Sequence, residues 1–183
     1  MLSSLLALAV QAATPPAARP GRLACASNGG QAENSLMLGG ARRVTGTLRR
    51  TRARVGLNAI RLAFTDEARI RWAGIAAERG PPPPIAATYF TPELVRWQRG
   101  QTFFTYGRGR TSAQMGAIIL RNEFRFELEL TPAGTLRASF EWQLDDGPRR
   151  VEGDIDLDGL QPDRLVFGCL VDDFTIEDLR LSN

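Results

Sequence analysis

Residues 123–144, EFRFELELTPAGTLRASFEWQL, decide the fold of this chain. Apolar residues alternate with polar ones over 123–130 and again over 136–144, which is the period of a β-strand with one buried face. Pro132, Ala133 and Gly134 separate the two runs and suit a three-residue loop in which the glycine is left-handed. The segment is therefore predicted to be an antiparallel hairpin with an apolar inner face and a charged outer face.

The short loop also sets the register of this hairpin. Phe126 should face Phe140 on the inner side, and Glu129 should face Arg137 on the outer side. Apolar pairs thus fall on one face and opposite charges on the other. Because a slip of one residue would exchange the two faces, the pattern specifies this register strongly.

Further strands are predicted wherever apolar residues recur in this way between glycine and proline turns. They cover residues 44–48, 55–64, 69–75, 102–106, 117–121, 151–157, 165–169 and 174–181, with a bulge in the last strand between Ile176 and Leu179. A loop is expected at 79–84, RGPPPP, and a short helical turn at 92–99. Many short strands and no long helical period indicate an all-β protein, an antiparallel two-sheet β-sandwich of the jelly-roll kind.

The N-terminal residues resemble an export signal. Residues 1–13, MLSSLLALAVQAA, contain a short apolar run followed by small residues, and they are too short to span a membrane. Residues 14–22 are rich in proline and alanine and are predicted to be a linker. We expect residues 23–183 to form a single β-sandwich domain that is secreted or periplasmic, with no transmembrane segment.

The chain has two cysteines, Cys25 and Cys169, at opposite ends of the predicted domain. In an exported protein such a pair is expected to form a disulfide, which here would tie the terminal strands together. Two buried free thiols are the alternative.

Composition limits the chemistry that the protein can perform. The sequence contains no histidine and no lysine. An imidazole base, a histidine metal site, a Ser-His or Cys-His couple and a Schiff-base lysine are all excluded. A catalyst built from this chain would have to use carboxylates, tyrosines or arginines.

Three segments, in this order, resemble the concanavalin A-like and laminin G-like jelly-roll domains. They are RIRWAGIAAER at 69–79, the hairpin and its Asp-Gly turn at 123–147, and VFGCLVDDFTIEDLRL at 166–181. The resemblance implies a concanavalin A-like sandwich, a fold that is often directed at carbohydrate and often binds calcium. Laminarinase-type glycoside hydrolases of this fold carry three acids at alternate positions of one strand. Here Glu127 and Glu129 occupy two such positions, and Thr131 replaces the third.

Glu127 and Glu129 are therefore the catalytic candidates if the protein is a glycoside hydrolase, because two nearby carboxylates can serve as acid and base. The alternative is a solvated outer face on which arginines pair with them.

Asp154, Asp156 and Asp158 match the opening of a calcium loop, D-x-D-x-D-G. Leu165 stands where such a loop needs a bidentate acid, and the intervening residues alternate as in a strand. We expect no cofactor, and any calcium bound here should be weak.

Arg49, Arg50, Arg52 and Arg54 form a basic run that could hold an anionic glycan or surface polymer. A solvated edge strand is the alternative. Among the aromatic residues of the middle segment, Trp97 and Tyr106 are candidates for exposed rings that stack on sugars.

These observations favour an exported, non-catalytic module that binds a glycan or an anionic surface polymer. Nucleic acid is not an expected partner of an exported chain. The alternatives are a carboxylate-dependent glycoside hydrolase and a structural envelope or adhesion module without a small ligand.

Overall fold

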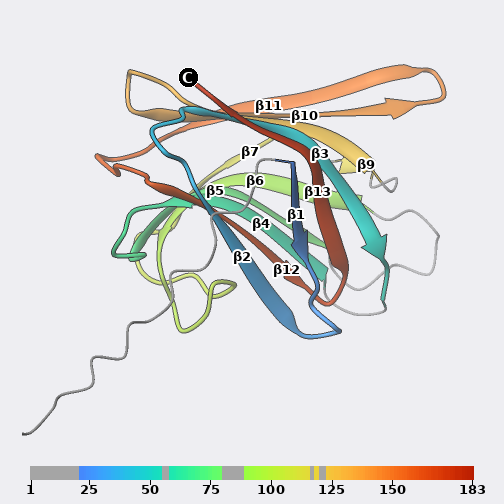
Figure 1. Ribbon diagram of the computed structural model, residues 1–183, viewed down its shortest axis with the longest axis horizontal. Helices are drawn as coiled ribbons and strands as arrows, with labels where there is room; N and C mark the ends of the chain where they lie inside the picture. Colours follow the sequence, from blue (N-terminus) through green and yellow to red (C-terminus); the bar gives the residue numbers. More distant parts are fainter. Residues whose placement is uncertain (1–20, 55–57, 80–88, 116–117, 120–122) are drawn as a thin grey trace, which may run out of the picture.

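The computed structural model describes residues 21–183 except 55–57, 80–88, 116–117 and 120–122. Within these residues the protein is an all-β sandwich of two antiparallel sheets with jelly-roll character (Figure 1). No helix long and apolar enough to cross a membrane occurs among them. The predicted signal at 1–13, most of the linker at 14–22 and the proline-rich stretch after Arg79 lie outside the described residues.

We name the two layers the front sheet and the back sheet. The front sheet has the order β1 (Arg22–Cys25), β13 (Asp173–Ser182), β3 (Arg43–Arg52), β9 (Glu123–Leu130), β10 (Thr135–Leu144) and β11 (Gly147–Asp156). The back sheet has the order β2 (Gln31–Met37), β12 (Arg164–Leu170), β4 (Asn58–Thr65), β5 (Arg71–Arg79), β6 (Tyr89–Gln98) and β7 (Thr111–Gln114). The short strand β8 (Ile118–Ile119) also pairs with β6.

The predicted hairpin is confirmed as β9 and β10. Phe126 faces Phe140 and Glu129 faces Arg137, and Gly134 in the connecting loop has a φ of 79°. The bulge in the last strand is confirmed as well, since the pairing of β13 with β3 shifts between Glu177 and Arg180. Local alternation and turn chemistry were sufficient to specify both features.

Two predicted elements are wrong. Residues 92–99 were expected to form a helical turn, but 92–98 belong to β6, whose pairing with β5 places Trp97 opposite Trp72. Residues 102–106 were expected to form a strand but form a turn, in which Phe103 is buried against the back sheet. In both places long-range packing of aromatic residues overrides the local pattern.

The disulfide between Cys25 and Cys169 is present, with Cα atoms 6.0 Å apart. Cys25 lies on β1 of the front sheet and Cys169 on β12 of the back sheet, and both are buried. The bond therefore joins the two layers across the core, in addition to linking the two ends of the domain.

A second apolar cluster covers the outer face of the back sheet. The segment that follows β6 folds back over this face, so that Phe103 packs with Trp72, Trp97 and Val166. Its ring lies so close to Gly168 of β12 that a Cβ there would come within 2.4 Å of it. This part of the back sheet is therefore covered.

We predict that the Cys25→Ala, Cys169→Ala double variant is less stable than the wild type by about 2–5 kcal/mol, because the bond closes a loop of 144 residues in the unfolded chain. Urea unfolding in the absence of reductant measures the difference. Wild type unfolded with reductant present should show a comparable loss. Identical unfolding midpoints for oxidised wild type and the variant would contradict the prediction.

Candidate functional site

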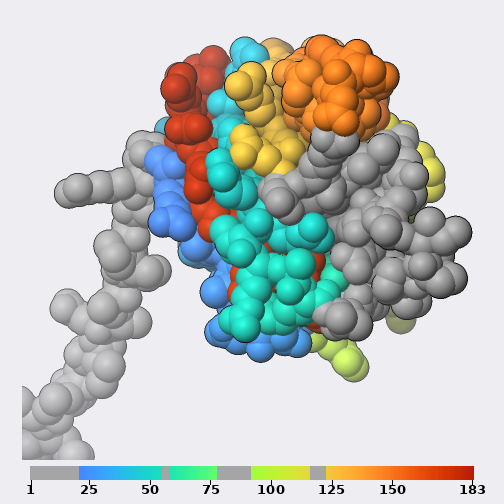
Figure 2. All heavy atoms as spheres, turned by 90° about the vertical axis from the view of Figure 1, so that its right-hand side faces the viewer, coloured from blue at the N-terminus to red at the C-terminus, as the bar shows by residue number. Residues whose placement is uncertain are grey.

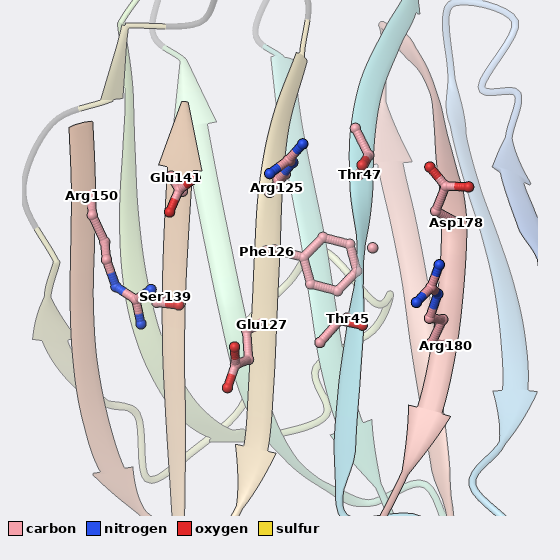
Figure 3. Close-up of a pocket in the computed structure, with 11 residues that line it drawn as sticks. Thr45, Thr47, Arg125, Phe126, Glu127, Ser139, Glu141, Arg150, Asp178 and Arg180 are labelled. Carbon is pink, nitrogen blue, oxygen red and sulfur yellow. The ribbon is translucent and has the colours of Figure 1, made fainter. Parts of the chain in front are cut away.

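The outer face of the front sheet contains a hollow of about 490 Å³. Its floor includes three short polar side chains, Thr45 and Thr47 from β3 and Ser139 from β10 (Figure 3). Longer charged side chains from β9, β10, β11 and β13 surround them. The hollow thus extends across five adjacent strands, β13, β3, β9, β10 and β11. Figure 2 shows this sheet from the side, with β13 in red, β3 in cyan and the later strands in yellow to orange.

Strand register explains why the surface is hollowed at this point. Glu127 of β9 lies between Thr45 on one neighbouring strand and Ser139 on the other. Arg125, two residues earlier, lies beside Thr47. Since alternate residues of a strand share a face, these short and long side chains all project outward together. Short residues in the middle of a charged face leave a depression.

The rim of the hollow carries charges of both signs. Arg125, Arg150 and Arg180 line it together with Glu127, Glu141 and Asp178. Glu127 is paired with Arg43 at 2.8 Å, and Arg150 lies 3.3 Å from Glu152.

Two of these arginines remain available to a ligand. Arg125 and Arg180 are exposed, and neither forms an ion pair or a side-chain hydrogen bond within the described part of the chain. Their guanidinium groups therefore face the solvent beside the hollow.

The predicted acid pair is divided between two environments. Glu127 lines the hollow, whereas Glu129 lies outside it and is paired with Arg137 at 3.5 Å. The second carboxylate that the hollow contains on the neighbouring strand is Glu141, which faces Arg125. Any chemistry by two glutamates in this hollow would therefore use Glu127 and Glu141, not Glu127 and Glu129.

The predicted basic run is not an open cationic surface. Arg49 is paired with Glu123 at 2.8 Å and with Glu177 at 3.3 Å. Arg50 lies 3.7 Å from the buried Asp172, and Arg52 is exposed at the end of β3. The sequence could not show these pairings, because the acids come from strands distant in the chain.

Arg54 has a structural role instead. Its Nη1 and Nη2 atoms donate to the two carboxylate oxygens of Asp173, each at 2.8 Å, and Nη1 also donates to the carbonyl oxygen of Val171. The hydroxyl and backbone N–H of Ser27 donate to the same carboxylate. These hydrogen bonds, that of Arg54 above all, lower the pKa of Asp173 to about 2.

The expectation of exposed rings at Trp97 and Tyr106 is wrong for Trp97. Its side chain is only 2% exposed and stacks on Trp72, with ring centroids 6.0 Å apart. Tyr106 is half-buried, and the guanidinium of the buried Arg61 lies 4.1 Å from its ring centroid. Both rings belong to the covered side of the back sheet.

The three aspartates of the predicted calcium loop are not gathered around one point. Asp154 and Asp156 lie along β11, where alternate residues are about 6–7 Å apart. Asp156 and Asp158 each have a carboxylate oxygen 3.8 Å from the Arg96 guanidinium. Among the residues that the structure describes, no group of three or more His, Cys, Asp or Glu side chains could hold a metal ion.

Comparison with known proteins supports the fold. No family model and no curated protein matches the chain. A solved scytalido-glutamic peptidase, crystallised with a peptide-based transition state analogue, is similar at a TM-score of 0.50 and 10% identity, covering 85% of this chain and 76% of that one.

Two other solved structures have lower similarity. The CBM2 module of the Lactobacillus casei BL23 phage J-1 evolved Dit has a TM-score of 0.43 at 8% identity, covering 80% and 69% of the two chains. Bacillus licheniformis β-glucanase has a TM-score of 0.44 at 10% identity, covering 88% and 78%. At such identities a likeness concerns the fold alone. The β-sandwich implied by the sequence resemblance is confirmed, and membership of a particular family is not shown.

We predict that Asp173→Asn destabilises the protein near neutral pH, because Arg54 loses its carboxylate partner. The pKa of Asp173 in the folded protein, about 2, lies below its ordinary value of 3.8. The ionised Asp173 carboxylate therefore contributes its full stabilisation at pH values above its ordinary pKa. This stabilisation is lost as the pH falls toward 2. The difference in unfolding free energy between wild type and variant should shrink over that interval, as urea titrations at several pH values would show.

The exposed pair of Asp146 with Arg149 supplies the control for this experiment. Asp146→Asn should change stability by less than about 1 kcal/mol, as is usual for surface ion pairs. A difference in unfolding free energy between wild type and Asp173→Asn that stays constant from neutral pH to pH 2 would show that the contact between Arg54 and Asp173 does not act through the carboxylate charge.

Proposed function

We propose that the protein is a non-catalytic glycan-binding module and that the hollow on the front sheet is its binding site. The observation that carries the proposal is the composition of this hollow. A floor of Thr45, Thr47 and Ser139 is surrounded by guanidinium and carboxylate groups within about 490 Å³ of open space.

This combination suits a polyhydroxylated ligand. A sugar hydroxyl both donates and accepts hydrogen bonds, so it can accept from Arg125 and donate to Glu141. Hydroxyls of the floor can act in either role, and charged groups form the stronger hydrogen bonds. A purely anionic or cationic ligand would use only half of these groups.

The hollow offers hydrogen bonds without a stacking platform. Phe126 is its aromatic residue, and this side chain is 4% exposed because its ring is directed toward the core. We therefore expect recognition of an uncharged glycan chain through its hydroxyls. The arginines that were expected to attract an acidic polymer are occupied at Arg49, Arg50 and Arg54 by carboxylate partners.

An exported location would fit a glycan partner. A disulfide persists in oxidising compartments, where extracellular and envelope polysaccharides are encountered. A secreted or periplasmic location is accordingly part of the proposal.

We predict that an Arg125→Ala, Arg180→Ala double variant binds the preferred glycan of a glycan array at least about ten-fold more weakly than wild type. Each substitution removes charged donors from the rim, and one such hydrogen bond contributes about 1.5–3 kcal/mol. Isothermal titration with that glycan gives the dissociation constants. The melting temperature should change little, because both side chains are exposed and unpaired within the described residues.

Arg137→Ala is the matched control, since Arg137 lies on the same face but outside the hollow. It should bind like wild type. Absence of binding by wild type to every neutral glycan, or equal binding by the double variant, would remove the front-sheet hollow from consideration as the site.

A carboxylate-dependent hydrolase is the second candidate, favoured by the presence of Glu127 and Glu141 in one hollow. They are diagonal neighbours on adjacent strands, a relation that places the two residues about 7–8 Å apart, with their Cβ atoms somewhat closer. That separation is of the order found for carboxylates in inverting glycosidases.

If the protein is a non-catalytic module, wild type should not hydrolyse polysaccharides. An assay for newly released reducing ends measures this. Peptide substrates should also be assayed, because a peptidase shares the two-sheet fold. Hydrolysis that disappears in Glu127→Gln and Glu141→Gln but persists in Glu129→Gln would instead establish the hydrolase.

A further inference from the structure

A second hollow, of about 280 Å³, lies where the turn after β11 meets β5 and β6. It shares no lining residue with the front-sheet hollow. Its walls include Trp72 and Trp97 from the back sheet together with Leu157 and Leu160 from the turn. The two hollows are therefore separate and differ in their lining groups.

One wall residue has an unused hydrogen-bond donor. The indole N–H of Trp72 donates to the carbonyl oxygen of Arg69 at 3.1 Å. The indole N–H of Trp97 is buried and has no acceptor within the described part of the chain. A buried donor without a partner is destabilising, and such a group in a native protein calls for an explanation. An acceptor atom on a bound molecule would supply the missing partner.

Arginines outnumber acids among the other groups that line this hollow. Arg71, Arg96 and Arg110 line it, whereas Asp158 is its one carboxylate among the described residues. The front-sheet hollow, by contrast, carries three arginines and three acids.

Carboxylates pair with Arg96 and Arg110, whereas Arg71 has no carboxylate partner within the described part of the chain. Arg71 donates to the carbonyl oxygens of Asp158 at 3.1 Å and Gly159 at 3.3 Å. Arg96 donates to the carbonyl oxygen of Asp156 at 3.0 Å and is also paired with the carboxylates of Asp156 and Asp158, each 3.8 Å away. Arg110 alone is closely paired, with Glu93 at 2.7 Å. Fixed guanidinium groups match the planar geometry of a carboxylate with little loss of side-chain entropy.

We propose that this second hollow binds a small organic carboxylate. The apolar part of the ligand would lie against the tryptophans and Leu160, and its carboxylate would lie among Arg71, Arg96 and Arg110. The volume is below the range of drug-sized pockets, which begins at about 300 Å³, and so limits the ligand to a small molecule.

Benzoate is a suitable probe, with benzyl alcohol as the uncharged molecule of matched shape. Titration of the folded full-length protein, followed by tryptophan fluorescence and by melting temperature, should show saturable binding of benzoate in the millimolar range. Benzyl alcohol should bind at least about ten-fold more weakly, because a lost charged hydrogen bond has about this effect.

Arg96→Gln and Arg110→Gln should each weaken benzoate binding by roughly ten-fold. The Arg110 side chain is 44% exposed, so Arg110→Gln should fold normally. It therefore still tests the proposal if Arg96→Gln does not fold. Arg180→Gln, in the front-sheet hollow, should bind benzoate like wild type. No saturable response in wild type, equal affinity for benzoate and benzyl alcohol, or an unchanged affinity in Arg110→Gln would each overturn the proposal.

Discussion

The alternation of apolar and polar residues along the front-sheet strands is the constraint on which the rest of the structure depends. It buries one face of each strand against the back sheet and obliges the other face to carry charge. In β9 and β10 it also sets which residues are neighbours, so Glu127 stands beside Ser139. The hollow is thus a consequence of register: short hydroxyl side chains fall between long charged ones on a face that cannot be apolar. The disulfide adds a covalent connection between the layers.

Features set by local sequence could be predicted, and those set by distant partners could not. The hairpin register follows from the alternation and the loop around Gly134, and the bulge near Asp178 follows from a change of apolar parity. The bounds of β1 and the strand β2 were not anticipated, because β1 has four residues and β2 is a mostly polar and exposed edge strand. Residues 92–98 become a strand only because β5 pairs with them.

The same division applies to the candidate site. Glu127 was identified from its strand, but its neighbour Thr45 belongs to β3, about eighty residues earlier, and nothing local pairs β3 with β9. Arg54 resembles a surface cation until Asp173 is brought to it by the fold. Trp97 lies in a polar stretch, yet the segment after it folds back and buries its ring. The outward positions of threonine and serine on charged strands are the one signal that could have indicated a hollow.

Chemical-shift mapping tests the central claim most directly, because it locates a ligand without altering the protein. ¹⁵N-labelled protein titrated with a neutral oligosaccharide selected on a glycan array should show its largest amide perturbations at Thr45, Thr47 and Ser139, on both sides of β9. Residues around Trp97 should change little. Perturbations confined to the back sheet, or no saturable perturbation with any neutral glycan, would contradict the account.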